Sequence, residues 1–251
     1  MGILNVTPDS FSDGGRWART DLAVARGRQM VAEGADIVDV GGESTRPRAE
    51  PVSTAEEMRR VIPVIEALAD QVRVSVDTRN AAVAETAVAA GATLINDVSA
   101  CLWPTAAAGG VGWVAMHMQG EPATMHESPH YDDVVAEVSA FLAARAAEAR
   151  NHGVAEVWVD PGIGFGKSPA HNLALLAHLD VLTAGAHPVM VGTSRKSFLA
   201  ALVGEVPPLE AHDRLEPSLA TAIFALSRGA AMVRVHDVAA TVAAVRLMGD
   251  S

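Results

Sequence analysis

The stretch RVSVDTRNAAVAETAVAAGATLINDV, from Arg73 to Val98, contains one complete repeat of the fold. An apolar run over Arg73–Thr78 predicts a buried strand, Ala81–Ala90 has the period of a helix, and Leu94–Val98 returns to a strand pattern. Gly91 follows the helical segment, where a left-handed C-cap favours glycine. Two such strands joined by a helix predict a β-α-β unit with parallel strands.

The same alternation continues along the whole chain. The other predicted strands are Gly2–Val6, Ile37–Gly41, Trp113–His117, Glu156–Asp160, Pro188–Thr193 and Met232–His236. Further predicted helices are Asp21–Glu33, Ala55–Ala69, a short one near Pro104–Gly110, Asp132–Asn151, Asn172–Leu182 and Val238–Leu247. Eight evenly spaced strands favour an α/β fold, a (β/α)8 TIM barrel forming a single domain over residues 1–251. A doubly wound open sheet is the alternative.

Composition and charge limit the class of protein. The 251 residues are 49% hydrophobic, which suits one large domain, and no apolar run approaches the roughly 20 residues of a membrane span. A net charge of -11 argues against nucleic-acid or membrane partners. The single cysteine, Cys101, rules out an intrachain disulfide framework, and no signal-peptide pattern opens the chain. We therefore expect a cytoplasmic protein.

Polar side chains stand at the C-terminal ends of seven predicted strands. These residues are Asn5, Asp77, Asn96 with Asp97, His117, Asp160, Ser194 to Lys196, and Arg234 with His236. Because active sites of barrels form at this end of the strands, we expect these side chains to share one rim. Asp39, inside the second predicted strand, also points toward the core. A buried carboxylate with satisfied hydrogen bonds is at least as good an interpretation of Asp39.

Three loops attract attention by their composition. Two long polar loops, NVTPDSFSDGGRW and GGESTRPRAEPVS, follow the first two strands and predict lids or binding loops. The third, PGIGFGKS over Pro161–Ser168, nearly matches the phosphate loop G-x-x-x-x-G-K-[ST], but proline replaces the first glycine. We therefore reject a nucleotide triphosphatase. Gly162, Gly164 and Gly166 still predict a tight backbone loop near a ligand.

Eight motifs together resemble the dihydropteroate synthase family. They are MGILNVTPDSFSDGG, DVGGESTRP, SVDT, INDVS, MHMQGEPATM, VDPGIGFGK, SRKSF and RVHDV, in the order of that family, from Met1 to about Leu247. The resemblance implies a transferase of folate biosynthesis that joins 6-hydroxymethyl-7,8-dihydropterin pyrophosphate to 4-aminobenzoate, giving 7,8-dihydropteroate and pyrophosphate. It also implies a homodimer, a Mg²⁺ cofactor, and sulfonamides as inhibitors that mimic the aminobenzoate.

The resemblance further implies roles for single residues. The pterin ligands would be Asp77, Asn96, Asp160 and Lys196. Pyrophosphate would be bound by Asn5, Arg46, Arg234 and His236, with Asn5 also near the metal. The aminobenzoate pocket would be formed by Thr45, Arg46, Pro47, Phe165 and Ser197. The catalytic residues would be Lys196, Arg234, His236 and Asp77.

Lysine usage gives an internal control on these roles. Of the 19 Lys and Arg residues only Lys167 and Lys196 are lysine, so a solvated face of this chain uses arginine. Lysine is a compact point charge and arginine a wide planar fork, which favours a site role for Lys196 between the two substrates. Lys167 would only brace the loop that carries Phe165.

Three other functions fit part of the pattern. A pterin barrel that transfers a methyl group from methyltetrahydrofolate would share the Asp and Asn ligands, and a catalytically silent paralogue would keep only pterin binding. A Schiff-base aldolase would use Lys196, with Arg195 lowering its pKa.

Overall fold

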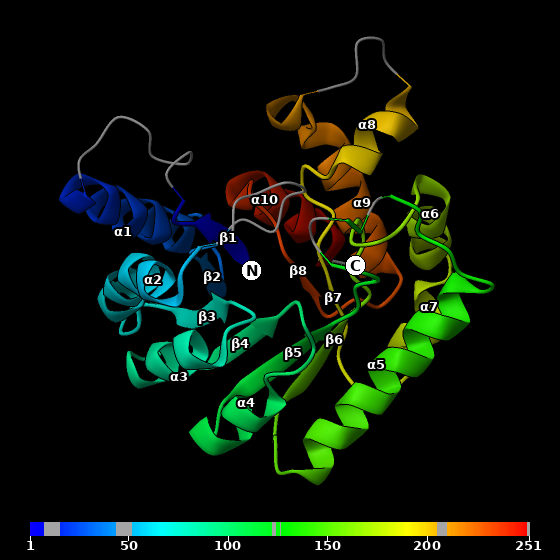
Figure 1. Cartoon of the computed structure of the whole chain (residues 1–251). Helices are drawn as coiled ribbons and strands as arrows, with labels where there is room; N and C mark the ends of the chain where they lie inside the picture. The colour runs from blue at the N-terminus through cyan, green and yellow to red at the C-terminus, as the bar shows by residue number, and fades with distance from the viewer. Residues whose placement is uncertain (8–15, 44–51, 122–123, 126, 205–209, 250–251) are drawn as a thin grey trace.

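The computed structural model describes residues 1–7, 16–43, 52–121, 124–125, 127–204 and 210–249. Its strands are β1 (Gly2–Asn5), β2 (Ile37–Gly41), β3 (Arg73–Asp77), β4 (Leu94–Asp97), β5 (Gly112–Met116), β6 (Val157–Asp160), β7 (Met190–Val191) and β8 (Met232–Val233). The helices that surround them (Figure 1) are α1 (Arg16–Ala32), α2 (Thr54–Leu68), α3 (Ala81–Ala89), α4 (Trp103–Gly109), α5 (Val134–Asn151), α6 (Pro169–Ala177), α7 (Leu179–Thr183), α8 (Ser197–Val203), α9 (Leu215–Ser227) and α10 (Val238–Gly249). None of these helices has the length and apolarity that crossing a membrane requires.

The parallel strands close into a barrel. Strands β1 to β6 pair in sequence order, and β7 pairs with β8. Parallel bridges from Val159 to Val189 and from Gly2 to Val235 join these two sheets, and the Ile3 amide donates to the Val235 carbonyl at 2.9 Å. The predicted (β/α)8 barrel is therefore confirmed, and the open sheet is wrong.

The register of the strands brings their polar ends together. Asn5 pairs with Gly41, Gly41 with Asp77, and Asp77 with Asn96. The residues before these ends are mostly buried Val, Ile and Leu, because a parallel sheet covered by helices is apolar on both faces. The apolar runs thus place one polar residue after another on the same rim.

Three predicted elements differ from the structure. The seventh and eighth strands, predicted over Pro188–Thr193 and Met232–His236, keep regular pairing only at two residues each. The predicted helix Asn172–Leu182 begins earlier, at Pro169, because Ser168 caps it and proline suits the first turn. It also divides at His178, where the backbone leaves helical geometry, into α6 and α7.

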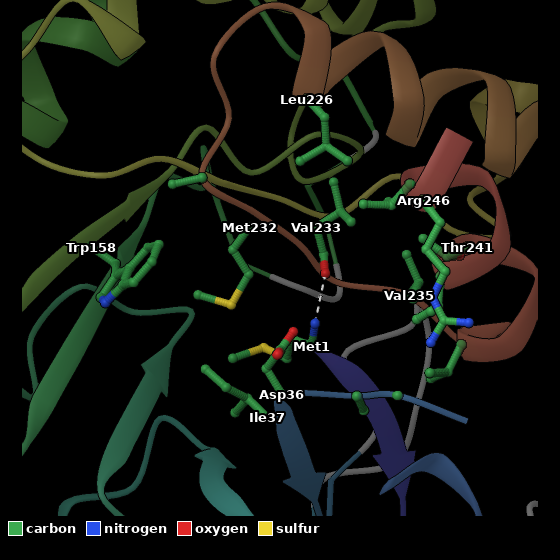
Figure 2. A pocket seen from close by; sticks show the side chains of 16 residues that line it. Met1, Asp36, Ile37, Trp158, Leu226, Met232, Val233, Val235, Thr241 and Arg246 are labelled. Atoms are coloured by element: carbon green, nitrogen blue, oxygen red, sulfur yellow. Dashed lines mark hydrogen bonds between the residues drawn. The ribbon is translucent and has the colours of Figure 1, made fainter. Parts of the chain in front are cut away.

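The opposite end of the barrel holds a cavity of about 400 Å³ (Figure 2). Its walls come from the starts of the strands, including Met1, Ile37, Trp158 and Met232. The α-amino group of Met1 donates to the Val233 carbonyl at 3.0 Å, drawn as the dashed line. Most of the lining is apolar, and this end of a barrel usually serves stability, so the polar rim is the candidate for chemistry.

Asp97 ends β4 but belongs to the structure of the following turn. Its carboxylate is completely buried and accepts hydrogen bonds from the amides of Ser99, Cys101 and Leu102, at 2.8, 2.7 and 2.6 Å. The indole of Trp113 donates to it at 3.0 Å. This carboxylate thus stabilises the turn that leads from β4 to α4.

We predict that Asp97→Asn lowers the free energy of unfolding by about 2 kcal/mol, because an amide NH₂ would face several N–H donors. Urea denaturation at neutral pH measures the change. The matched control is Asp70→Asn in an exposed turn, expected within about 0.5 kcal/mol of the parent. Equal effects of the two substitutions would contradict the structural role of Asp97.

Candidate active site

One guanidinium joins two carboxylates at the centre of the rim. Nε of Arg234, just after β8, donates to Oδ2 of Asp39 at 2.6 Å, and its NH2 group donates to Oδ2 of Asp77 at 2.6 Å. The two carboxylates raise the pKa of Arg234 above its ordinary value, although burial alone would lower it. Burial raises the pKa of Asp77, and the charge of Arg234 opposes that rise.

Asp39 lies beside these residues, and the sequence had left its role open. Oδ2 of Asp39 also accepts from Nδ2 of Asn96 at 2.9 Å, so the amide of Asn96 is oriented by a buried carboxylate. Oδ1 of Asp39 is buried and has no hydrogen-bond partner among the described residues. Asp39 is therefore buried, as one of the two interpretations has it, and one of its two carboxylate oxygens is paired among the described residues. Its place two residues before the end of β2, on the inward side, was the available signal.

Lys196 reaches the rim from the segment between β7 and α8. Its ammonium donates to the carbonyl of Ile163 and lies 4.5 Å from the ring centre of Phe165. Burial lowers the pKa of Lys196 to about 8, while the negative charge of Asp160 acts in the opposite direction. Burial also raises the pKa of Asp160, and the Lys196 ammonium is the main group that counteracts this.

Arg195 does not lower the pKa of Lys196, which corrects the premise of the Schiff-base hypothesis. Its guanidinium pairs with Asp237, with Nε 3.0 Å from Oδ2. The contributions that lower the pKa of Lys196 are burial and the charge of Arg234. The backbone of Arg195 has a φ of 59°, which turns consecutive side chains to different partners.

The loop of residues 161–168 packs tightly, as its glycines predict. A Cβ at Gly162 would collide with the carbonyl of His117, and one at Gly166 with the carbonyl of Gln119. Lys167 is buried and its Nζ donates to the Phe165 carbonyl at 3.0 Å, so the prediction that it braces this loop is confirmed. The sequence did not predict its other partner, His117, which directly follows β5.

His236 lies beside the segment that carries Lys196. Its Nδ1 is 3.0 Å from Oγ of Ser194, and its backbone amide donates to the same hydroxyl at 3.1 Å. NH2 of Arg26 in α1 donates to the His236 carbonyl at 3.2 Å. Ser197, the first residue of α8, is exposed. The structure thus brings His236 and the start of α8 to the rim from neighbouring strands.

Asn5 and Asp77 lie on either side of Gly41, and Oδ2 of Asp77 already accepts from Arg234. A Cβ at Gly41 would be 3.7 Å from Oδ1 of Asn5 and 3.7 Å from Oδ2 of Asp77. Within the described ranges, no group of three or more His, Cys, Asp and Glu could hold a metal ion. Mg²⁺ commonly binds through one or two protein oxygens together with phosphates and waters, so the oxygen of Asn5 fits Mg²⁺ bound with a phosphorylated ligand.

Part of the expected site lies outside the described residues. Thr45, Arg46 and Pro47 fall in residues 44–51, and most of the first long loop falls in residues 8–15. The described rim nevertheless contains Asn5, Asp77, Asn96, Asp160, Phe165, Lys196, Ser197, Arg234 and His236. This arrangement combines acceptors, donors and the two cations Lys196 and Arg234 on one rim.

Comparisons with known proteins agree with this site. The family model described as pterin binding enzyme matches residues 1–236. Dihydropteroate synthase of Escherichia coli strain K12 is 46% identical over 256 residues, covering 99% of this chain and 89% of the relative. Two solved structures cover 100% of this chain at a TM-score of 0.92. They are dihydropteroate synthase of Xanthomonas albilineans with 4-aminobenzoic acid, 48% identical with 91% of that chain covered, and that of Yersinia pestis with a sulfonamide drug, 44% identical with 92% covered.

We predict that both lysines titrate far below the ordinary pKa of 10.5, Lys196 at about 8 and Lys167 at about 7, because burial disfavours their cations. Labelling with [6-¹³C]lysine gives only two Cε resonances to follow with pH, and Lys167→Arg assigns them. Asp160→Asn should lower both pKa values further, since Asp160 raises them. Two resonances titrating near 10.5 would contradict the burial of these groups.

Proposed function

The chain belongs to the dihydropteroate synthase family of pterin-binding enzymes, and from that premise we propose which of its residues carry out the reaction. The enzyme condenses 6-hydroxymethyl-7,8-dihydropterin pyrophosphate with 4-aminobenzoate, giving 7,8-dihydropteroate and pyrophosphate in folate biosynthesis. The observation that carries this function is the rim on which Asp77, Asn96, Asp160, Lys196 and Arg234 meet.

The pterin is held by Asp77, Asn96, Asp160 and Lys196. A pterin has a guanidine-like edge with several N–H donors, and a carboxylate can accept two of them side by side. Asp160 is 5% exposed and already accepts from the Gly162 amide at 2.7 Å, which fixes its orientation. Asn96 has both a donor and an acceptor and reads the mixed pattern beside it. Its donor side is directed by Asp39.

The pyrophosphate leaving group is bound by Arg234 and His236, with Arg46 and Asn5 as further ligands. The methylene C–O bond breaks, its electron pair stays with pyrophosphate, and the positive charge left on the methylene carbon is delocalised into the pterin ring. Cations placed in advance around the departing oxygens stabilise the charge that develops there. Arg234 keeps its position because two carboxylates hold it.

Mg²⁺ is the cofactor that the side-chain oxygen of Asn5 would hold together with the pyrophosphate. When bound, it supplies further positive charge to the phosphate oxygens. The protein groups retain their own task, which is to bind and orient the phosphorylated pterin.

The aminobenzoate enters beside Phe165, in a pocket formed also by Thr45, Arg46, Pro47 and Ser197. Its neutral amine attacks the methylene carbon, the C–N bond forms, and the amine loses its extra proton afterwards. Such a nucleophile needs positioning more than deprotonation, so the reaction requires no general base to activate it. Sulfonamides would occupy the same pocket as inhibitors.

We also propose how the protein is organised. Residues 1–251 would form one pterin-binding barrel domain that assembles as a homodimer in the cytoplasm. A closed barrel that joins strands from β1 to β8 supports the single domain, the exposed free cysteine Cys101 fits the cytoplasm, and the homodimer rests on the family alone.

The direct test incubates the folded protein with dihydropterin pyrophosphate, radiolabelled 4-aminobenzoate and Mg²⁺. We expect labelled dihydropteroate and one pyrophosphate per turnover, and loss of most product when EDTA removes the metal. The absence of product from protein whose fold is verified by circular dichroism would contradict the proposed function.

Lys196→Arg should lower kcat/KM by at least about tenfold while the fold survives, because a planar guanidinium is wider than the ammonium. The space is narrow: a Cβ at Gly164 would be only 2.9 Å from Cδ of Lys196. The matched control is Arg59→Lys on α2, where the side chain is 47% exposed, and it should leave the rate unchanged. Near-normal turnover of Lys196→Arg would refute the steric argument.

A further inference from the structure

Lys167 has all three N–H donors directed at buried acceptors. Nζ lies 2.9 Å from Nδ1 of His117, 3.3 Å from the His117 carbonyl and 3.0 Å from the Phe165 carbonyl. The side chain is 3% exposed, in a chain whose solvated basic positions are arginine. An ammonium donates three separate hydrogen bonds in a tetrahedral arrangement, whereas the donors of a guanidinium lie in one plane. The three acceptors therefore match lysine.

His117 is a neutral acceptor in this pair. When Lys167 is protonated its ammonium has no lone pair, so Nδ1 accepts the hydrogen bond and the imidazole proton resides on Nε2. Burial, and secondarily the charge of Lys167, lowers the pKa of His117 to about 3. The ring is buried against Phe141 and Tyr131, at centroid distances of 5.0 and 6.0 Å, which fixes its orientation. The pair thus links the end of β5 to the loop of residues 161–168.

The same loop forms the surroundings of Lys196. The Ile163 carbonyl accepts from the Lys196 ammonium, and the Phe165 ring lies 4.5 Å from it. Lys167 holds the carbonyl of Phe165, so the position of that ring depends on the bond from Lys167. Tyr131 adds a hydrogen bond to the Gly166 carbonyl at 2.9 Å. Lys167 therefore supports a contact of Lys196 through one residue, Phe165.

We propose that Lys167 and His117 form a buried positioning pair, which fixes the loop of residues 161–168 so that Phe165 and the Ile163 carbonyl hold Lys196 in its working position. The role rests on the proposed function, because Lys196 and Phe165 are there assigned to the two substrates. Neither Lys167 nor His117 contacts a reacting atom. Their effect on the reaction passes through the loop.

The test compares Lys167→Met and His117→Phe, which keep the size of each side chain, with the double variant. Lys167→Met leaves Lys196 as the only lysine, so a single [6-¹³C]lysine resonance reports its surroundings without any need for activity. We expect this resonance to shift from its wild-type position because the Phe165 ring moves. We also expect KM for 4-aminobenzoate to rise about tenfold in both single variants, and no further in the double variant because the two residues act as one unit.

The control for lost stability is Val64→Ala, which opens space in the buried face of α2 far from the rim. It should lower the melting temperature but leave the Lys196 resonance and KM unchanged. An unshifted Lys196 resonance in Lys167→Met, or additive effects of the two single variants on KM, would overturn the proposal. If Lys167→Met does not fold, an unshifted Lys196 resonance in His117→Phe would overturn the proposal instead. If the wild-type protein makes no dihydropteroate, the proposed function is refuted. The Lys196 resonance then still tests whether Lys167 and His117 position Lys196.

Discussion

The site depends on one guanidinium that must satisfy two buried carboxylates. Asp39 and Asp77 extend from neighbouring strands into the barrel, and without a cation between them two negative charges would be buried at short range. Arg234 supplies that cation from β8, which closes the barrel against β1. Removing one partner of such a buried pair is far more costly than the net contribution of the pair. Closure of the barrel and assembly of the rim are therefore one event.

This constraint extends to the protonation states around it. The charge of Arg234 lowers the pKa of Lys196 and also lowers that of Asp160, while burial lowers the first and raises the second. Each carboxylate at the rim has a cation near it, and each cation is held by hydrogen bonds from elements adjacent in space. A phosphorylated anion can approach the rim of this acidic protein because the fold places Arg234 and Lys196 there. The local field of these cations outweighs the net negative charge of the chain.

The sequence predicts the strands and helices, which follow from hydrophobic periodicity, and the rim residues that lie at the ends of strands. Asp77 and Asn96 could be placed side by side because each lies at or next to the end of a strand of one β-α-β unit, and the parallel register then aligns them. The contact of Arg234 with Asp39 joins residues 195 positions apart, and that of Lys167 with His117 joins residues 50 apart. Such pairs follow from barrel closure and side-chain direction, which no periodicity encodes. The short regular pairing of β7 and β8 likewise depends on the adjacent strands of the closed barrel, which the local sequence does not specify.

The loop of residues 161–168 shows why a near match to a phosphate loop has another role here. In a phosphate loop the backbone amides are open to the anion and the lysine extends toward it. Here the Gly162 amide donates to Asp160 and the Gly164 amide donates to Asn172, both at 2.7 Å. Lys167 turns inward to His117. The glycines permit this loop to pack closely on the end of β5 and beside Lys196. The loop therefore separates the two lysines, and its amides do not bind the anion, which is the proposed task of Arg234.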